Sequence, residues 1–206
     1  MKKTVFFGGS FDPVHNGHLS LAKEILRLGK AHQVLFVPAN VLPHTYKSGE
    51  NVTAFSHRFA MLERAVAGES GFLLSDIESR REGRSYTVDT LRILRAEGAW
   101  GELSLLMGED SLLKLHTWKE AHALVEEFPL IVYPRKGSRV TREMLSPYWS
   151  PAEQDKLLST LLPEMEEFDI SSTQVREFCK KGAFSGLSAF VKKEVCDYIM
   201  QNKLYS

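Results

Sequence analysis

The stretch from Gly8 to Leu19 constrains the fold of this chain more than any other, because it joins two segments of different hydrophobic period. Before it, Thr4–Phe7 is a short, uncharged run of β-prone residues that predicts a buried strand. After it, apolar residues recur at helical spacing until Gly29, where the helix is predicted to end: Leu19, Leu21, Ala22, Ile25 and Leu26. The stretch is therefore predicted to be a strand-to-helix connection.

The residues of this connection suit a ligand that carries phosphate. Gly8 and Gly9 allow the backbone to approach a ligand closely and to adopt positive φ. Asp12-Pro13 is a turn dipeptide. The helix start offers unpaired N–H groups and the positive end of the helix dipole, and His15 and His18 can both project from its first turn. Glycine backbone, two imidazoles and a helix start at one point suit a polyphosphate.

Two other interpretations of the connection stay open from these residues alone. Gly-Gly followed by Asp-Pro also fits an ordinary turn, and two histidines three residues apart also fit half of a metal site. Two common phosphate-binding motifs are excluded, because the chain has neither Gly-x-x-x-x-Gly-Lys-Ser/Thr nor Gly-x-Gly-x-x-Gly.

Length and charge narrow the class of protein. A chain of 206 residues is long enough for one sizeable α/β domain and short for two. A formal net charge of zero argues against a general nucleic-acid or membrane-surface binder. Cys179 and Cys196 belong to no Cys-x-x-Cys motif, and no stretch is apolar enough for a signal peptide or a membrane span. We expect a reduced, cytoplasmic protein.

The remainder of the chain alternates strand-like and helical patterns. Strands are predicted at Gln33–Pro38, Phe72–Ser75, Leu103–Met107, Leu130–Tyr133 and, as a short strand, Glu166–Asp169. One helix is predicted with a face of Phe55, Phe59, Leu62 and Val66, and another opens at Ser85-Tyr86-Thr87 and ends near Gly98. Three more helices are predicted to start at capping boxes: Thr117–Glu120, Ser150–Glu153 and Ser171–Gln174. A final amphipathic helix is predicted over Leu187–Ile199. Glu78–Arg84 is expected to be a charged surface turn.

This alternation predicts an α/β fold: a Rossmann-like, doubly wound parallel sheet with flanking helices and a C-terminal helical segment over about 171–206. We expect one domain over residues 1–206. Ligands of such sheets bind beyond the carboxyl ends of the strands. Residues 8–18, 39–47 and 108–110 each follow a predicted strand, so we expect them to form one site.

Two segments resemble the signatures of a known superfamily. Gly-Gly-Ser-Phe-Asp-Pro-Val-His-Asn-Gly-His, at residues 8–18, resembles the first signature of nucleotidyltransferases with an H-x-G-H motif. Ile-Ser-Ser-Thr-Gln-Val-Arg, at residues 170–176, resembles their second signature, I-S-S-T-x-[IV]-R. Nearly the whole chain is similar to bacterial nicotinate-nucleotide adenylyltransferases. The resemblance implies that a mononucleotide phosphate attacks the α-phosphorus of ATP and releases pyrophosphate.

The resemblance also implies roles for particular residues. His18, His15 and Arg176 are expected to act on the transferring and leaving phosphates. ATP and its phosphates are expected at Gly8, Gly9, Ser10, Phe11, His15, His18, Lys47, Gly108, Asp110, Ser171, Ser172, Thr173 and Arg176. The nicotinate nucleotide is expected at Asn40, His44, Lys47, Tyr86, Thr87 and Trp118. Mg²⁺ is expected to come with ATP rather than to occupy a protein metal site. The expected partners are these small molecules, with no nucleic acid and no membrane, and the oligomeric state is open.

The chain departs from the family pattern at two positions: Ser10 stands where threonine is frequent, and His116 where proline often precedes the Thr-Trp pair. Three alternatives are weighed against the expected activity. Phosphopantetheine adenylyltransferases are shorter and lack the Ser-Tyr-Thr and Thr-Trp segments, and cytidylyltransferases normally carry a different second signature. A non-catalytic nucleotide sensor on the same fold would not need His15, His18 and Arg176 together.

Overall fold

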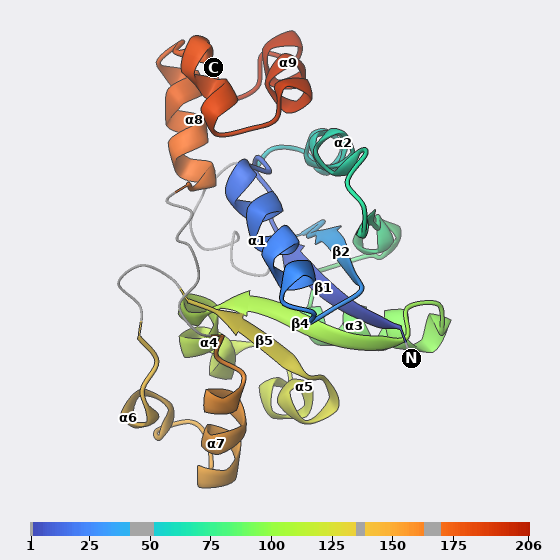
Figure 1. Ribbon diagram of the computed structural model, residues 1–206, viewed down its shortest axis with the longest axis vertical. Helices are drawn as coiled ribbons and strands as arrows, with labels where there is room; N and C mark the ends of the chain where they lie inside the picture. Colours follow the sequence, from blue (N-terminus) through green and yellow to red (C-terminus); the bar gives the residue numbers. More distant parts are fainter. Residues whose placement is uncertain (1, 42–51, 135–138, 163–169) are drawn as a thin grey trace. The chain divides into compact units, whose positions relative to one another are not determined.

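The computed structural model describes residues 2–41, 52–134, 139–162 and 170–206. The chain divides into two compact units (Figure 1). The first unit comprises residues 1–7 and 86–167, and the second comprises residues 8–85 and 168–206. Each unit therefore combines segments that are distant in the sequence. The expectation of a single domain over residues 1–206 stays a prediction.

The strands form a five-stranded sheet in the order β3-β2-β1-β4-β5. Their bounds are Lys3–Gly9 (β1), Gln33–Pro38 (β2), Phe72–Leu74 (β3), Glu102–Gly108 (β4) and Leu130–Tyr133 (β5). In the first unit β1 pairs in parallel with β4, with Phe6 opposite Leu105, and β4 pairs in parallel with β5. In the second unit β2 pairs in parallel with β3. The parallel, Rossmann-like sheet that the alternating pattern predicts is confirmed.

The order of the strands fixes where the chain can build a ligand site. Successive strands run outward from β1 to β3, and the chain then returns to place β4 on the other side of β1. Sheets of this kind bind ligands beyond the carboxyl ends of the strands at such a reversal. The stretch from Gly8 to Leu19 begins with the last two residues of β1, and Gly108 ends β4.

The helices of the first unit are short, and two of them, over Glu109–Lys114 and Arg142–Leu145, were not predicted from the sequence. Their bounds are Thr87–Glu97 (α3), Glu109–Lys114 (α4), Ala121–Glu127 (α5), Arg142–Leu145 (α6) and Pro151–Ser159 (α7). The capping box predicted at Ser150 is confirmed, with Pro151 at the first helical position. Helix α4 packs against β4 and β5.

The capping box predicted at Thr117–Glu120 is wrong. The Thr117 hydroxyl donates to the carbonyl of Lys114, 2.7 Å away, and lies in a 3₁₀ turn over Leu115–Thr117 instead of capping a helix. Trp118 is extended, and α5 begins three residues later at Ala121. A Ser/Thr-x-x-Glu pattern therefore fails here because the hydroxyl bonds backward to a neighbouring turn.

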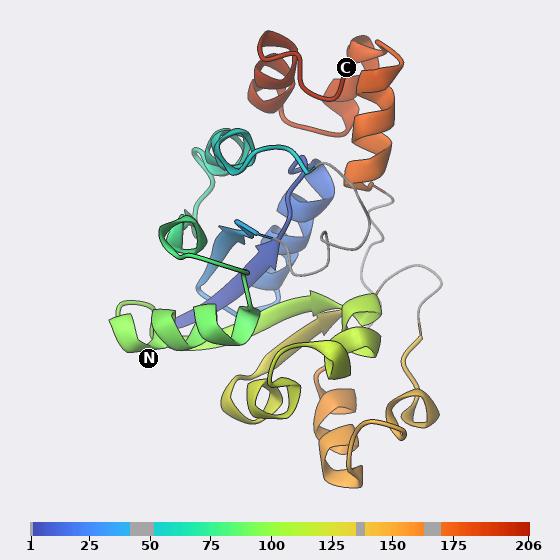
Figure 2. The same cartoon turned by 180° about the vertical axis from the view of Figure 1, so that it is seen from behind.

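The helices of the second unit are Asn16–Arg27 (α1), Phe55–Val66 (α2), Ser172–Lys180 (α8) and Lys193–Gln201 (α9), which Figure 2 shows from behind. The helical stripe predicted for α1 is buried from Leu19 to Ile25, and Gly29 ends it at φ 66°. Helix α2 packs against β2, β3 and α9. The predicted short strand at Glu166–Asp169 lies outside the described residues.

The face of α2 was predicted one position away from the buried one. Its buried residues are Arg58, Met61, Leu62 and Ala65, whereas Phe55 and Phe59 are half-buried. The guanidinium of Arg58 turns inward because it donates to backbone carbonyls, so a charged residue occupies the core stripe. Glu78 also differs from the expected surface turn: it is buried, in a 3₁₀ turn over Ile77–Arg80.

The predicted final helix over Leu187–Ile199 is divided into two parts. A 3₁₀ turn covers Phe184–Ala189, and α9 begins only at Lys193. Asn16 of α1 binds the segment between these two parts. Its backbone N–H donates to the carbonyl of Phe190 at 2.7 Å, and its side-chain amide donates to the carbonyl of Ala189. Because these two carbonyls accept hydrogen bonds from Asn16, they do not take part in a continuous helix.

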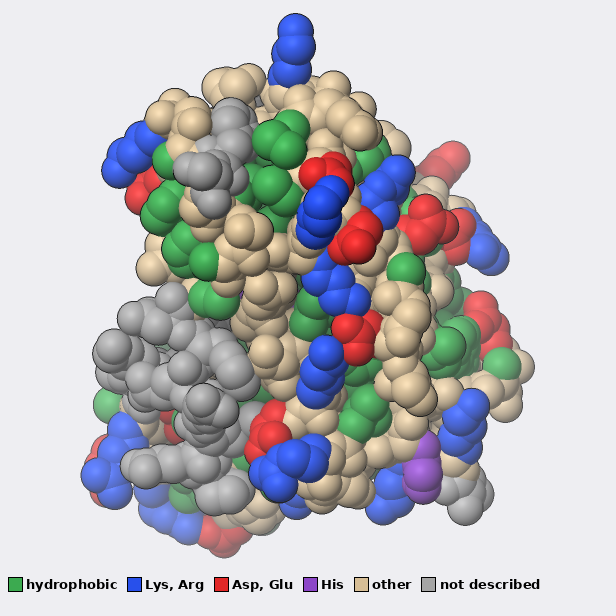
Figure 3. Space-filling view, turned by 45° about the horizontal axis from the view of Figure 1, so that its top comes forward, with side chains coloured by type: hydrophobic (Ala, Val, Ile, Leu, Met, Phe, Trp, Pro, Cys, Tyr) green, Lys and Arg blue, Asp and Glu red, His purple; other side chains and the backbone are tan. Residues whose placement is uncertain are grey.

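One face of the molecule carries charged side chains of both signs. On the face in Figure 3, basic and acidic side chains of the described residues lie next to one another across its centre. None of the helices in the described ranges is long and apolar enough to cross a membrane.

Cys179 and Cys196 are free and buried, and burial raises the pKa of both thiols. Raised pKa values make these thiols poorly reactive.

Candidate active site

The glycine stretch begins as the last part of a strand. β1 continues through Gly9, and neither Gly8 nor Gly9 adopts the positive φ that glycine permits. The carbonyl of Gly9 accepts a hydrogen bond from the N–H of Ala39 at 2.9 Å. A Cβ atom at Gly9 would lie 3.3 Å from the ring of Phe11, so the absence of a side chain lets this ring pack on the strand.

The left-handed residue of the loop is Phe11, with φ 48° and 1% exposure. A buried aromatic residue rarely adopts this conformation, so its neighbours must hold it. Arg58 donates to the carbonyl of Ser10 at 2.7 Å on one side. On the other side Tyr205 donates to the Asp12 carboxylate at 2.6 Å. The loop is therefore held on both sides of its strained residue.

The two histidines lie at the start of α1, with their rings stacked at a centroid distance of 3.7 Å. His15 is the N-cap residue and is buried, whereas His18 is half-buried in the first turn. The backbone N–H of His15 donates to Nδ1 of His18 at 3.2 Å. Because Nδ1 accepts this bond, the neutral ring of His18 carries its proton on Nε2.

The second signature forms the start of α8, as predicted. Ser171 and Gln174 make a reciprocal capping box. The hydroxyl of Ser172 donates to the carbonyl of Pro13 at 2.9 Å, and Nη1 of Arg176 donates to the carbonyl of Asp12 at 2.7 Å. Segments that are about 160 residues apart in the sequence thus meet in the second unit.

Arg176 is directed by two contacts. Besides the carbonyl of Asp12, its guanidinium reaches the Thr173 hydroxyl through Nη2, at 3.2 Å. The side chain is half-buried. A guanidinium fixed by two of its nitrogens keeps other N–H groups for an anion at the same helix start.

Of the predicted nucleotide residues after β2, only Asn40 falls in the described part of the chain. Its N–H donates to the Ser85 hydroxyl at 3.0 Å, and its carbonyl accepts from Arg58 at 3.4 Å. His44 and Lys47 lie outside the described residues. Ser85, which the motif places before Tyr86, therefore ties the end of β2 to the residues before α3.

The first unit holds the other predicted residues. Gly108 ends β4 and is the N-cap residue of α4, and Asp110 is exposed in the first turn of that helix. The helix predicted to open at Ser85-Tyr86-Thr87 is confirmed: Tyr86 is the N-cap residue of α3 and Thr87 is its first residue. Trp118 is half-buried in the extended segment after the 3₁₀ turn.

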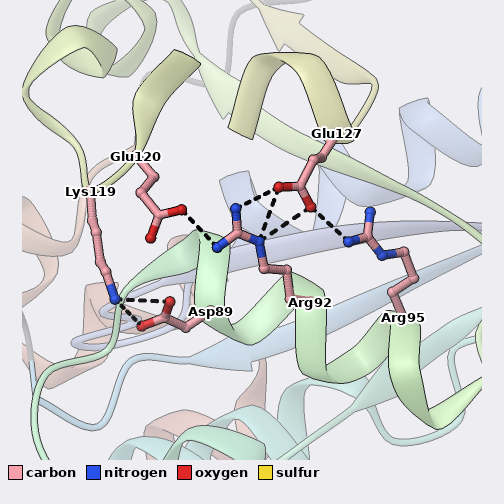
Figure 4. Close-up of polar contacts among 6 residues, drawn as sticks. All are labelled: Asp89, Arg92, Arg95, Lys119, Glu120 and Glu127. Carbon is pink, nitrogen blue, oxygen red and sulfur yellow. Dashed lines mark hydrogen bonds and ion pairs between the residues drawn. The ribbon is translucent and has the colours of Figure 1, made fainter. Parts of the chain in front are cut away.

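Lys119 links the Trp118 segment to the start of α3 (Figure 4). Its ammonium is 2.9 Å from the Asp89 carboxylate and 5.1 Å from the centre of the Tyr86 ring. A cation at this distance over an aromatic face is attracted to it. Lys119, the residue after Trp118, therefore lies against Tyr86 and Asp89 at the start of α3, within the first unit.

The same figure shows a network that holds α3 to α5. Arg92 contacts both Glu120 and Glu127, and Arg95 contacts Glu127 at 2.6 Å. Hydrogen bonds from Arg92 and then from Arg95 lower the pKa of Glu127 to about 2. Because Arg95 and Glu120 are exposed and Arg92 and Glu127 are only half-buried, we expect these ion pairs to contribute little to the stability of the fold.

His116, which replaces the usual proline, stacks on Tyr148 with a ring-centroid distance of 3.6 Å and an interplanar angle of 5°. The 3₁₀ turn over Leu115–Thr117 thus forms with histidine in this position. Within residues 2–41, 52–134, 139–162 and 170–206, no three His, Cys, Asp or Glu side chains are grouped so that they could hold a metal ion.

Comparison with known proteins assigns the chain to a family. The model of the cytidylyltransferase-like family matches residues 6–178. A Neisseria meningitidis protein named "Probable nicotinate-nucleotide adenylyltransferase" is 37% identical over 207 residues, which cover 100% of this chain and 99% of the relative. A Carboxydothermus hydrogenoformans protein of the same name is 36% identical, with 98% of each chain covered. The chain belongs to the nicotinate-nucleotide adenylyltransferase family.

Solved structures agree on the fold of this family. A Plasmodium falciparum nicotinic acid mononucleotide adenylyltransferase complexed with NaAD matches 100% of this chain and 98% of its own, with a TM-score of 0.78 and 22% identity. A second structure of that enzyme, complexed with APC, matches with a TM-score of 0.76. At this identity the likeness concerns the fold alone. The chain is thus an α/β nucleotidyltransferase by sequence family and by architecture.

Proposed function

We propose that this chain transfers the adenylyl group of ATP to nicotinate mononucleotide, giving deamido-NAD and pyrophosphate in NAD biosynthesis. The observation that carries the proposal is the meeting of the two signatures in the second unit. Ser172 and Arg176 of the second signature donate to the carbonyls of Pro13 and Asp12 in the first. Two helix starts and two imidazoles then surround one short loop, which suits a triphosphate.

The chemistry of the step needs positioned charge more than a protein nucleophile. An oxygen of the acceptor's phosphate forms a bond to the α-phosphorus of ATP, and the bond from that phosphorus to the bridging oxygen of the leaving pyrophosphate breaks. His18 carries its neutral-ring proton on Nε2, and we assign that N–H to an oxygen of the transferring phosphate. His15 stacks on His18 and holds its orientation.

Arg176 is assigned to the departing pyrophosphate. Arg176→Lys keeps the charge and loses the planar fork that reaches Asp12 and Thr173 together. We expect a loss of about 10-fold or more in kcat/KM for ATP, corresponding to roughly one charge-assisted hydrogen bond. Steady-state kinetics at varied ATP and at varied acceptor measure this loss. Unchanged kcat and unchanged KM for ATP would remove Arg176 from this role.

We assign three residues of the first unit to the acceptor: Tyr86, Thr87 and Trp118. In the first unit the helix start at Tyr86 and Thr87 supplies N–H groups, and Trp118 supplies an aromatic face. We keep Asn40, His44 and Lys47 as acceptor-binding residues from the family resemblance. Gly108 and Asp110, after β4, are kept for the adenosine part of ATP.

Nucleotidyltransferases generally use a divalent metal with ATP, and we propose Mg²⁺ for this chain. Mg²⁺ is usually held by one or two carboxylates together with substrate phosphates, so we expect the phosphate oxygens of ATP to be its main ligands. We also propose a cytoplasmic location, because two free, buried thiols fit a reducing compartment.

The test is pyrophosphate release from ATP with a panel of acceptors: nicotinate mononucleotide, nicotinamide mononucleotide, phosphopantetheine and flavin mononucleotide. We expect the highest kcat/KM with nicotinate mononucleotide. Turnover with phosphopantetheine instead would favour the related adenylyltransferase. Binding of ATP without pyrophosphate release for any acceptor would favour a nucleotide sensor.

A further inference from the structure

We propose that Tyr205 is a positioning residue for adenylyl transfer, which acts through the Asp12 carboxylate on the loop of residues 8–15 and on Arg176. The inference rests on the proposed function. Tyr205 belongs to neither signature, and its partner Asp12 lies 193 residues away in the sequence.

The Asp12 carboxylate is buried, and both of its oxygens are engaged. Oδ1 accepts from the Tyr205 hydroxyl at 2.6 Å, and Oδ2 accepts from the backbone N–H of Thr53 at 3.2 Å. Asp12 is 6% exposed. Burial and the hydrogen bond to Asp12 raise the pKa of Tyr205, so the phenol keeps its proton and remains a donor.

Arg58 explains why a carboxylate is needed at this place. Its guanidinium is 1% exposed and donates to the carbonyls of Thr53 and Ser10, each at 2.7 Å, and to that of Asn40. Carbonyls satisfy the N–H groups of Arg58 without neutralising its charge. Burial lowers the pKa of Arg58, and the charge of Asp12 is the largest effect that opposes this. The negative charge of Asp12 therefore partly offsets the cost of burying Arg58.

The two groups restrain the loop on either side of its strained residue. Arg58 fixes the carbonyl of Ser10, and Tyr205 fixes the side chain of Asp12, with left-handed Phe11 between them. Asp12 has a second task, since its carbonyl accepts from Nη1 of Arg176. A displaced Asp12 would move the peptide that orients the guanidinium assigned to pyrophosphate.

The turn that follows α9 places Tyr205. The N–H of Lys203 donates to the carbonyl of Met200, and the N–H of Leu204 donates to that of Ile199. Lys203 and Tyr205 both have positive φ, at 51° and 63°. This conformation is unfavourable for both side chains, so the contact with Asp12 helps to hold it.

The test is a double-mutant cycle between Tyr205→Phe and Arg176→Lys. The phenylalanine keeps the ring and removes only the donor. We expect Tyr205→Phe to lower kcat/KM for ATP by about 5- to 10-fold, the effect of roughly one hydrogen bond, with KM for nicotinate mononucleotide within twofold of wild type. In the Arg176→Lys background we expect the same substitution to cost less than twofold, because the two residues act as one unit.

Tyr198→Phe is the matched control. Tyr198 lies in α9 and shares a hydrogen bond with His57 at 2.9 Å, outside the loop. We expect it to change the melting temperature but not the kinetics. Wild-type kinetics in Tyr205→Phe, or a defect that multiplies fully with that of Arg176→Lys, would overturn the inference while leaving the proposed function intact. A wild-type protein without adenylyl transfer in the same assay would overturn the proposed function and the inference with it.

Discussion

His18→Ala is expected to lower kcat by about 10²–10³-fold, the loss found for one preorganised donor to transition-state charge. The structure gives a physical reason for this size. The bond from the N–H of His15 to Nδ1 fixes the ring, so Nε2 presents its proton without reorganisation during the reaction. Stacking on His15 and an edge contact with Phe11 remove further freedom from the imidazole. Preorganisation of this kind raises kcat more than it lowers KM.

Single-turnover measurements with saturating ATP and nicotinate mononucleotide test this expectation. His57→Ala is the control, because His57 is also a half-buried histidine of the second unit but contacts Tyr198 instead of the loop. We expect near wild-type kcat for the control. The melting temperatures of both variants show whether either substitution destabilises the fold, including through loss of the bond between the N–H of His15 and the His18 ring. A kcat within a few-fold of wild type for His18→Ala, in a folded protein, would exclude His18 from the chemical step.

The parts of the fold that the sequence predicts correctly are those set by local signals. The run Leu130–Tyr133 forms β5 as expected, because an apolar run stopped by Pro134 has few alternatives. Ser171 and Gln174 form their capping box because both partners lie within one turn. In the same way His15 and His18 fall at the start of α1, where the strand-to-helix connection places them.

The errors arise where distant groups decide the local structure. Arg58 is buried on α2 because carbonyls from Ser10 and Asn40 surround it, and neither is visible from the helical pattern. A charged residue inside the stripe formed with Met61, Leu62 and Ala65 is the one available signal. The contact of Tyr205 with Asp12 has no local signal at all, since its two residues are at opposite ends of the sequence.

We expect kcat/KM for nicotinate mononucleotide to exceed that for nicotinamide mononucleotide by about 10²-fold or more. One or two charge-assisted hydrogen bonds to a carboxylate contribute roughly 1.5–3 kcal/mol each, which a neutral carboxamide cannot match. We assign the donors to the N–H groups at the start of α3, where the Tyr86 side chain makes no capping hydrogen bond. The NH₂ group of the amide would face these donors.

The charges near this helix start decide whether the preference survives. Asp89 lies in the first turn of α3 and would repel a carboxylate, but its own carboxylate is paired with Lys119 at 2.9 Å. Lys119 also lies over the Tyr86 ring. The charges of Asp89 and Lys119 therefore largely cancel, and we expect the N–H groups and the helix dipole to determine the preference for the acid.

We expect the preference for nicotinate over nicotinamide mononucleotide to change when a charge at the start of α3 is removed. Lys119→Met removes the cation that balances Asp89, and we expect the ratio of kcat/KM values to fall by about 2- to 5-fold, as for one lost charge interaction at a partly exposed site. Arg95→Met makes the same change of charge in the last turn of α3 and should leave the ratio unchanged. Both ratios are measured at fixed ATP with the two nucleotides side by side. Equal kcat/KM values in the wild type, or a preference for the amide, would show that the start of α3 does not bind the carboxylate.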